Sequence, residues 1–334
     1  MLAASIHIKH KLEVKIKNKI KILLLCILWP FVLIGSSGHL IFNKKDMKQK
    51  TIKKEIYFKG IGVHSGLYST VTLKPAAPDS GIIIKNTASD ESCLKVGDVV
   101  PVESKFATIL SNDEWQIGTL EHLMAAISCV GIDNLIIEIE GIEVPILDGS
   151  ALPFVRKILK VGFTQQDSKK LFLTPKKKLV FEDEKDGRYL EFLPAEERDG
   201  KKDKNLYIDY FASFENPIVG EGQINCCLTK NYFCKEIAPA RTFGFLEQLP
   251  MMQKLGLAKG ASLENTVVIG EKGYLNARRF DDEFVRHKLL DMLGDLALMG
   301  AQLSGKIVAK KTGHSFNRLV VENYLSNSDD WMFF

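Results

Sequence analysis

This 334-residue chain lacks paired cysteine motifs and a strong net charge, and each absence excludes a class of protein. Its six cysteines include no Cys-x-x-Cys spacing, which argues against a disulfide framework and against a zinc–thiolate site and indicates a reduced, cytosolic chain. The formal net charge is +4, and residues 1–46 carry eight lysines against two acidic residues. The rest of the chain is therefore close to neutral, which gives no indication of nucleic-acid binding.

Long apolar runs are also scarce, and the most prominent one, Ile22–Ile34, follows six lysines. It is shorter than the roughly 20 apolar residues that a membrane-spanning helix needs. Three interpretations of residues 1–46 stay open: a membrane anchor, a cleaved signal peptide, or sequence upstream of a true start at Met47. Membrane contact is expected only through this segment, and the rest of the chain is expected in the cytoplasm.

The remaining sequence predicts two folded domains. Hydrophobic residues make up 46% of the chain and charged residues 26%, which is usual for globular proteins, and about 150 residues per domain is typical. A helix, a strand, a turn with glycine and a second helix occur in this order twice. These elements are expected at 120–130, 134–140, 147–150 and 151–161, and again at 284–300, 305–310, 312–315 and 314–325.

This repeated order predicts an α+β fold of two similar domains, each a β-sheet with two α-helices, packed with the active site between them. We expect the first domain to span residues 47–169 and the second residues 170–325, with a tail at 326–334. Thr119 is expected to cap the first helix. Alternating or short apolar segments predict further strands at 55–64, 68–74, 81–85, 171–181, 189–193, 206–214 and 223–228, and a short helix is expected at 247–257.

The predicted helix 284–300 carries the pattern most informative about chemistry. His287, Asp291 and Asp295 are spaced four residues apart and therefore share one face of an α-helix, with Lys288 at its edge. Apolar residues occupy most of the remaining circumference, which predicts that the polar face lines a cleft. A histidine and an aspartate at i and i+4 can supply two ligands to one zinc ion. For this spacing taken alone, a solvated stripe with one His–Asp ion pair is the alternative.

Three further residues are candidates for the same site. Glu121 and His122 lie in the first turn of their helix, where the helix dipole favours an ionised carboxylate and a neutral imidazole. Those are the states that a general base and a metal ligand need, although an ordinary helix start is the alternative. His314 stands at a strand-to-helix turn, where functional groups are often presented.

Six motifs stand out along the chain: Gly62-Val63-His64-Ser65-Gly66, Thr119-Leu120-Glu121-His122-Leu123-Met124-Ala125-Ala126, Leu147-Asp148-Gly149-Ser150-Ala151, Arg241-Thr242-Phe243-Gly244, His287-Lys288-x-x-Asp291-x-x-Gly294-Asp295 and Gly313-His314. They occur in the order found in the UDP-3-O-acyl-N-acetylglucosamine deacetylase family, which this chain resembles over about residues 51–324. The resemblance implies a hydrolase that removes the acetyl group of UDP-3-O-acyl-N-acetylglucosamine in lipid A biosynthesis, built on a pair of α+β domains.

The resemblance also implies the cofactor and the substrate contacts. One Zn²⁺ ion, which Fe²⁺ could replace, would be held by His122, His287 and Asp291, with water at the fourth position. Lys288 and Phe243 would contact the substrate. The second domain would carry an insertion at 243–283, whose many leucines and methionines suit a passage for a fatty acyl chain.

The acid–base roles follow from the same resemblance. Glu121 would be the general base that delivers water to the acetamide carbonyl. Thr242 and a protonated His314 would stabilise the oxyanion, and His314 would then protonate the departing amine. Asp295 would keep His314 cationic, since a nearby carboxylate raises the pKa of an imidazole.

Two other interpretations stay open. A non-haem iron oxygenase also binds its metal with two histidines and one carboxylate, although it has no need of Glu121. A lipid- or nucleotide-sugar-binding module with a structural metal is the other, although structural zinc normally has four protein ligands and only three are candidates here. His64 and Asp148 match family motifs, but no role is assigned to them.

Overall fold

The computed structural model of the chain describes residues 33–34, 40–41, 47–88 and 93–334. In the N-terminal part, two short strands, β1 (Leu33–Ile34) and β2 (Leu40–Ile41), pair antiparallel. The sequence features behind the three interpretations of residues 1–46 lie almost entirely outside the described residues. Among the residues that are described, no helix is long and apolar enough to cross a membrane.

The body of the molecule, residues 48–334, contains two five-stranded sheets with matching topology. In both sheets the third and fourth strands of the spatial order run parallel, and every other neighbouring pair runs antiparallel. The first sheet is ordered β4 (Ile56–Ile61), β5 (Tyr68–Pro75), β10 (Leu135–Glu140), β6 (Ile82–Asn86) and β7 (Cys93–Lys95). The second is ordered β13 (Leu179–Asp183), β14 (Arg188–Leu193), β23 (Gly305–Lys310), β17 (Leu206–Ser213) and β18 (Glu221–Cys227).

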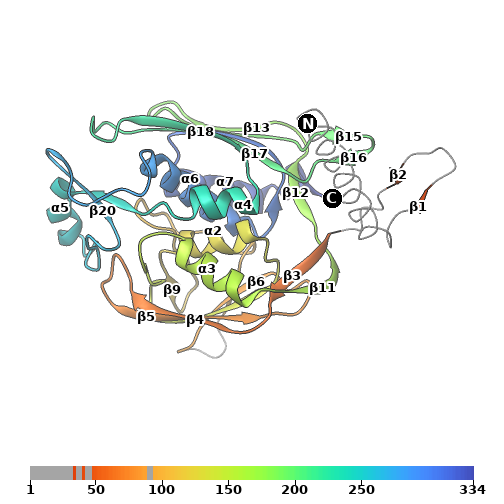
Figure 1. Cartoon of the computed structure of the whole chain (residues 1–334), viewed down its shortest axis with the longest axis horizontal. Coiled ribbons are helices and arrows are strands. Elements are labelled where there is room, and N and C mark those ends of the chain that lie inside the picture. The colour runs from red at the N-terminus through yellow and green to blue at the C-terminus, as the bar shows by residue number, and fades with distance from the viewer. Residues whose placement is uncertain (1–32, 35–39, 42–46, 89–92) are drawn as a thin grey trace, which may run out of the picture. The chain divides into compact units, whose positions relative to one another are not determined.

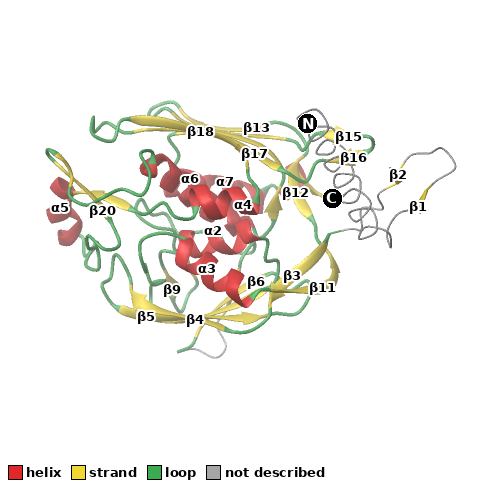
Figure 2. Cartoon of the chain, in the orientation of Figure 1, coloured by secondary structure: helices red, strands yellow, loops and turns green. Residues whose placement is uncertain are grey.

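Four helices lie between the two sheets, which form the upper and lower layers of Figure 1. Figure 2 shows the same sandwich, with helices in the middle layer and strands outside. Each unit holds two of the helices, one before and one after the last strand of its sheet in the sequence, so the predicted α+β fold of two similar units is confirmed. The helices are α2 (Glu121–Val130) and α3 (Leu152–Val161) of the first unit, and α6 (Glu283–Leu296) and α7 (His314–Ser326) of the second.

The sheets bury one face against the helices because their sequences alternate. In β10, Leu135, Ile137 and Ile139 are buried, whereas Ile136 and Glu138 are only partly covered. Side chains of a strand point to opposite faces with a period of two, so this pattern gives the strand one apolar face. The apolar faces of both sheets and all four helices contribute to a single buried cluster, which makes the two units share one core.

Shorter elements connect and cover these layers. The strands are β3 (Lys48–Ile52), β8 (Leu110–Ser111), β9 (Gln116–Ile117), β11 (Phe163–Lys169), β12 (Phe172–Pro175), β15 (Glu197–Arg198), β16 (Lys201–Lys202), β19 (Phe243–Phe245), β20 (Val267–Gly270), β21 (Gly273–Tyr274), β22 (Gln302–Leu303) and β24 (Trp331–Phe333). The helical turns are α4 (Lys230–Tyr232), η2 (Phe233–Ile237), η3 (Leu246–Gln248), α5 (Leu249–Lys254), η4 (Ala297–Met299) and η5 (Ser328–Asp330).

Several predicted boundaries differ from the structure. The helix predicted at 284–300 is α-helical only to Leu296, continues as the 3₁₀ turn η4, and stops at Gly300, whose φ of 72° is left-handed. The strand predicted at 171–181 is divided into β12 and β13. Pro175, which has no N–H to donate, stands at the end of β12.

Two further predictions, for the start of α2 and for the C-terminal segment, differ from the structure. Thr119 does not cap α2, because its hydroxyl donates to Glu143 Oε1 at 2.7 Å and its φ is 58°. The predicted tail at 326–334 forms η5 and β24, and β24 pairs antiparallel with β12. The proposed domain limits and the extent of the insertion at 243–283 stay predictions.

The two units approach each other closely where α2 meets α6. A Cβ atom built on Gly294 of α6 would lie 2.0 Å from the Glu121 carbonyl oxygen of α2. Only a residue without a side chain fits at such a distance. Glycine at this position therefore lets the first turn of α2 lie directly against the part of α6 that carries Asp291 and Asp295.

Replacement of Gly294 by Ala tests this contact. The added methyl group would collide with backbone, so we expect the free energy of unfolding to fall by about 1–3 kcal/mol. Gly118→Ala is the matched control, because the atom nearest to its added methyl group is Ile109 Cγ1 at 3.7 Å, an ordinary contact. Denaturant unfolding of both variants checks the prediction, and equal losses of stability in the two variants would contradict it.

Candidate metal centre and active site

Three potential metal ligands from two helices meet in one buried group. His122 at the start of α2, and His287 and Asp291 on α6, offer ligand atoms that all lie within 4.8 Å of one another. Asp291 Oδ1 is 3.3 Å from His287 Nε2 and 3.6 Å from His122 Nε2. The structure therefore brings together three residues from two distant segments of the sequence.

The hydrogen bonds of the two histidines fit a metal ion. His287 Nδ1 is 3.1 Å from the Ala240 carbonyl oxygen, to which it can only donate, so the lone pair of Nε2 faces Asp291. Burial lowers the pKa of His287 to about 3, which keeps the ring neutral. His122 Nδ1 is buried with no hydrogen-bond partner among the described residues, and its Nε2 faces the same carboxylate.

The aspartate of the group is ionised although it is buried. Burial disfavours the charge of Asp291, but His287 and Lys288 outweigh this effect and hold the pKa of Asp291 well below its usual range. The Lys288 ammonium donates to Asp291 Oδ2 at 2.7 Å. Two imidazole nitrogens and one carboxylate are donors that zinc commonly takes, so the group fits a divalent transition-metal ion.

Glu121 lies beside this group without belonging to it. Its side chain is buried, and its Oε2 atom accepts a hydrogen bond from the Thr108 backbone N–H at 3.0 Å. Burial raises the pKa of Glu121, and the charges of Asp291 and Asp295 act in the same direction. A carboxyl whose pKa is raised toward neutrality is suited to accept and return a proton.

His314 and Asp295 form a buried ion pair next to the ligand group. His314 Nδ1 is 2.9 Å from Asp295 Oδ2, and His314 Nε2 is 3.8 Å from Asp291 Oδ2. Burial opposes the imidazolium, but the charge and hydrogen bond of Asp295 outweigh it and raise the pKa of His314 to about 9. Asn317 Nδ2 donates to Asp295 Oδ2 at 2.7 Å. His314 is therefore cationic at neutral pH.

Thr108 is a site residue that the sequence analysis missed. Its backbone N–H binds Glu121, and its hydroxyl donates to Asp295 and lies 3.3 Å from His314 Nδ1. It stands in an irregular loop with no periodicity and outside the matched motifs. Only its contacts with residues distant in the sequence reveal it.

A cavity of about 590 Å³ extends from the ligand group. The predicted substrate contacts Lys288 and Phe243 line it, as does Thr242, the predicted oxyanion donor. The Lys288 ammonium lies 5.8 Å from the centre of the Phe243 ring. Apolar side chains from the predicted insertion supply much of the remaining wall. They include Leu246, Leu249, Met252, Leu263 and Leu275.

His64 also lines the cavity, on a turn held by a buried carboxylate. Glu143 accepts hydrogen bonds from the backbone N–H groups of His64 at 2.9 Å and Ser65 at 2.8 Å, and from the Thr119 hydroxyl. A Cβ atom on Gly62 would lie 2.1 Å from Glu143 Oε2. The glycine of this motif is therefore explained by the close approach of the carboxylate.

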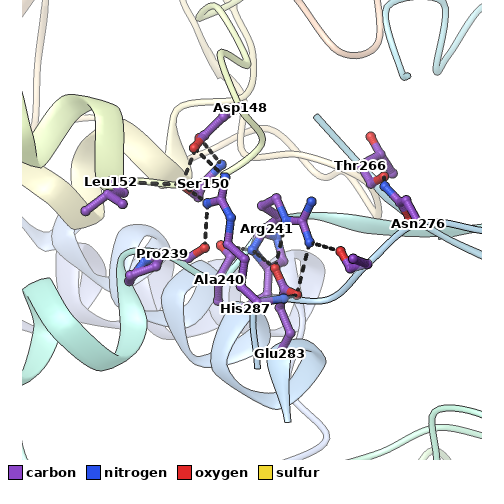
Figure 3. A network of polar contacts seen from close by, with 12 residues as sticks. Asp148, Ser150, Leu152, Pro239, Ala240, Arg241, Thr266, Asn276, Glu283 and His287 are labelled. Atoms are coloured by element: carbon purple, nitrogen blue, oxygen red, sulfur yellow. Dashed lines mark hydrogen bonds and ion pairs between the residues drawn. The ribbon is translucent and has the colours of Figure 1, made fainter. Parts of the chain in front are cut away.

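Asp148 lies outside the ligand group and forms an ion pair with Arg279. Its Oδ2 atom accepts from Arg279 Nη2 at 2.8 Å, and its Oδ1 atom accepts from the hydroxyl and backbone N–H of Ser150. Figure 3 shows this network beside Pro239, Ala240 and Arg241. Arg279 and Glu283, which belong to the same network, were not singled out from the sequence.

The site combines two histidines and an aspartate whose ligand atoms lie close together with a glutamate of raised pKa and a cationic histidine. This combination is typical of metal-dependent hydrolases. Residues 49–326 match the family described as LpxC, UDP-3-O-acyl N-acetylglycosamine deacetylase. The chain therefore belongs to this family, which makes it an enzyme of the deacetylase class.

Individual relatives agree with the family match. A protein from Syntrophotalea carbinolica is 39% identical over 286 residues, which cover 85% of this chain and 89% of that protein. A protein from Myxococcus xanthus is 38% identical, with 84% and 87% covered, and one from Haemophilus influenzae is 36% identical, with 86% and 93% covered. All three are named UDP-3-O-acyl-N-acetylglucosamine deacetylase.

The hydrogen bonds that Glu143 accepts at the His64 turn predict a pH-dependent contribution to the stability of the fold. Burial opposes the charge of this carboxylate, but the hydrogen bonds from Ser65, His64 and Thr119 outweigh this and lower the pKa of Glu143. A lowered folded-state pKa stabilises the protein fully above the ordinary glutamate value of roughly 4.3, and this stabilisation is lost as the pH falls through the lowered value. We therefore expect Glu143→Gln to cost about 1–3 kcal/mol at pH 7 and less at pH 3–4.

Urea unfolding at several pH values measures this difference. Glu140→Gln, at the exposed end of β10, serves as the control and is expected to change stability little at any pH. A Glu143→Gln deficit that stays constant from pH 7 to pH 3 would show that the charge of this carboxylate does not hold the turn.

Proposed function

We propose that this enzyme uses one zinc ion to hydrolyse the 2-acetamido group of UDP-3-O-acyl-N-acetylglucosamine, releasing acetate, as a cytoplasmic step of lipid A biosynthesis. The observation that carries the proposal is the buried group of His122, His287 and Asp291 beside Glu121 in the wall of a largely apolar cavity. The names of the relatives supply the substrate, and an acylated sugar suits a cavity with apolar walls.

His122, His287 and Asp291 would hold the zinc ion, which when bound supplies a Lewis acid for the acetamide carbonyl and acidifies water. Glu121 is the proposed general base. The hydrogen bond from the Thr108 N–H fixes its Oε2 atom, so Oε1 is left to accept the proton of the attacking water. Its raised pKa makes it a stronger base than an ordinary glutamate.

His314 is the proposed acid. Its Nδ1–H is engaged by Asp295, so Nε2 carries the proton that can be donated, and Nε2 is the atom nearer the ligand group. The Nε2–H would first donate a hydrogen bond to the developing oxyanion and then transfer its proton to the departing amine. The Thr242 hydroxyl, in the wall of the same cavity, is the second proposed donor to the oxyanion.

The polar and the apolar parts of the cavity wall suit different parts of the substrate. Lys288 would bind polar oxygens of the substrate, and Phe243 would pack against the sugar. The acyl chain would lie against Leu246, Leu249 and Met252, since flexible apolar side chains adapt to a flexible apolar ligand.

The proposed base is tested by acetate release from UDP-3-O-acyl-N-acetylglucosamine. We expect Glu121→Ala to lower turnover by about 100-fold or more while the protein retains its zinc, because general base catalysis supplies at least that factor. Glu271→Ala, on the exposed turn between β20 and β21, is expected to match the parent enzyme. Unchanged turnover of Glu121→Ala would remove this residue from the role, and a parent enzyme that releases no acetate would overturn the function.

The ligand set is tested by metal content. His122→Ala and Asp291→Ala are each expected to bind well under one zinc ion per chain by mass spectrometry, because each loses one of three protein ligands. His64→Ala, which alters the same cavity outside the ligand group, is expected to keep a full complement. Fe²⁺ suits the same donors, so readdition of each metal to chelated enzyme compares the two. A fully metallated Asp291→Ala protein would contradict the assignment.

A further inference from the structure

The irregular segment 239–242, between η2 and β19, carries two groups of the proposed site. The Ala240 carbonyl oxygen accepts the Nδ1–H of His287, and Thr242 lines the cavity. No helix or sheet ladder fixes the backbone of residues 240–242, so other contacts must hold it in place.

Hydrogen bonds from other elements hold both ends of this segment. The Pro239 carbonyl oxygen accepts from Arg279 Nη1 at 2.8 Å. The Thr242 N–H donates to the Gly149 carbonyl oxygen at 2.8 Å, and the Thr242 carbonyl oxygen accepts from the Val267 N–H at 2.9 Å. A Cβ atom on Gly149 would lie 1.7 Å from the Asn265 carbonyl oxygen, so glycine is required for this approach.

A buried carboxylate holds the middle of the segment. Glu283, in the first turn of α6, is fully buried and accepts from the Arg241 N–H at 3.0 Å and from Arg241 Nε at 2.9 Å. Its other oxygen accepts from the Arg279 N–H at 2.6 Å. Glu283 precedes His287 by one helical turn of α6. Glu283 holds the segment and the segment orients the His287 imidazole, so both side chains lie on the same helix.

Arg279 extends this network to the first unit. Its Nη2 atom donates to Asp148 Oδ2 at 2.8 Å, and its Nη1 atom donates to Ser150 Oγ at 3.2 Å as well as to Pro239. In Figure 3, Asp148 and Ser150 lie at one end of the network and Glu283 at the other, with Pro239, Ala240 and Arg241 between them. The guanidinium of Arg279 thus fixes Pro239 relative to both units at once.

We propose that Asp148, Arg279 and Glu283 are positioning residues of the metal centre, acting through the Ala240 carbonyl that orients His287. This inference rests on the proposed function, because it takes the ligand group to be a metal site. A histidine ligand held by a hydrogen bond at its other nitrogen binds metal in one tautomer and one orientation, and loss of such outer contacts typically weakens metal binding about 10- to 100-fold. Asp148, to which its sequence motif assigned no role, thus acts by holding Arg279.

Arg279 is the residue of the network best suited to mutation. The Arg279 side chain is 33% exposed. Glu283, by contrast, is fully buried, and its removal would leave the charge of Arg241 without its partner. The neighbouring Arg278 offers a matched control. Arg278 stacks on Tyr274 and binds the Asp281 carbonyl oxygen, with no contact to residues 239–242 among its described hydrogen bonds.

The experiment measures zinc affinity of the full chain by competition with a chromophoric chelator. We expect Arg279→Ala to weaken zinc binding about 10- to 100-fold and Arg278→Ala to stay within twofold of the parent protein. We also expect the visible absorption spectrum of the Co²⁺-substituted protein to change in Arg279→Ala and not in Arg278→Ala. A general loss of stability would not separate the two variants in this way.

Two further variants sharpen the result. Arg279→Lys is expected to be intermediate, because one ammonium cannot reproduce the fork that contacts Asp148, Ser150 and Pro239. Asp148→Ala combined with Arg279→Ala is expected to be no weaker than Arg279→Ala alone if the pair acts as a unit. Should Arg279→Ala fail to fold, Arg279→Lys against Arg278→Lys is judged by the same comparison.

Zinc affinity of Arg279→Ala within twofold of the parent protein, or equal weakening in both arginine variants, would overturn the inference alone. A parent chain that neither binds zinc nor releases acetate would instead overturn the proposed function, and the inference with it.

Discussion

The contact between α2 and α6 at Gly294 is the constraint on which the rest of the site depends. It lets the Glu121 carbonyl oxygen lie where a side chain would otherwise be. Because the helices meet so closely, His122 in the first turn of α2 reaches the Asp291 carboxylate of α6. A wider separation would leave these two side chains on facing surfaces of an ordinary helix pair.

Within that contact, neighbouring groups acquire opposite chemical characters from their surroundings. Burial is the largest influence on the pKa of Glu121 and raises it. The hydrogen bond that this carboxyl accepts comes from a neutral backbone N–H, that of Thr108. Burial also disfavours the charge of His314, but Asp295, itself bound by Asn317, outweighs it. A proton acceptor and a proton donor can therefore stand in one cavity at the same pH, a division of roles suited to acid–base chemistry.

The sequence predicted the parts of the site that depend on local geometry. Helical spacing alone placed His287, Asp291 and Asp295 on one face, and the repeated order of elements predicted two similar units. The pairing of His122 with this face needed the family resemblance, because no local pattern brings two distant helices together. Thr108 and Glu283 could not be predicted, since each acts through backbone contacts made only in the folded chain.

The origin of the ligand group in both units has a consequence for stability. His122 comes from the first unit and His287 from the second, so an ion bound by both ties the units together. A ligand that binds only the assembled state stabilises it by about 2.7 kcal/mol when its concentration is a hundred times its Kd. If the ligand group holds the proposed ion, the metal-free chain would unfold more readily and be more open to proteolysis than the metal-bound chain.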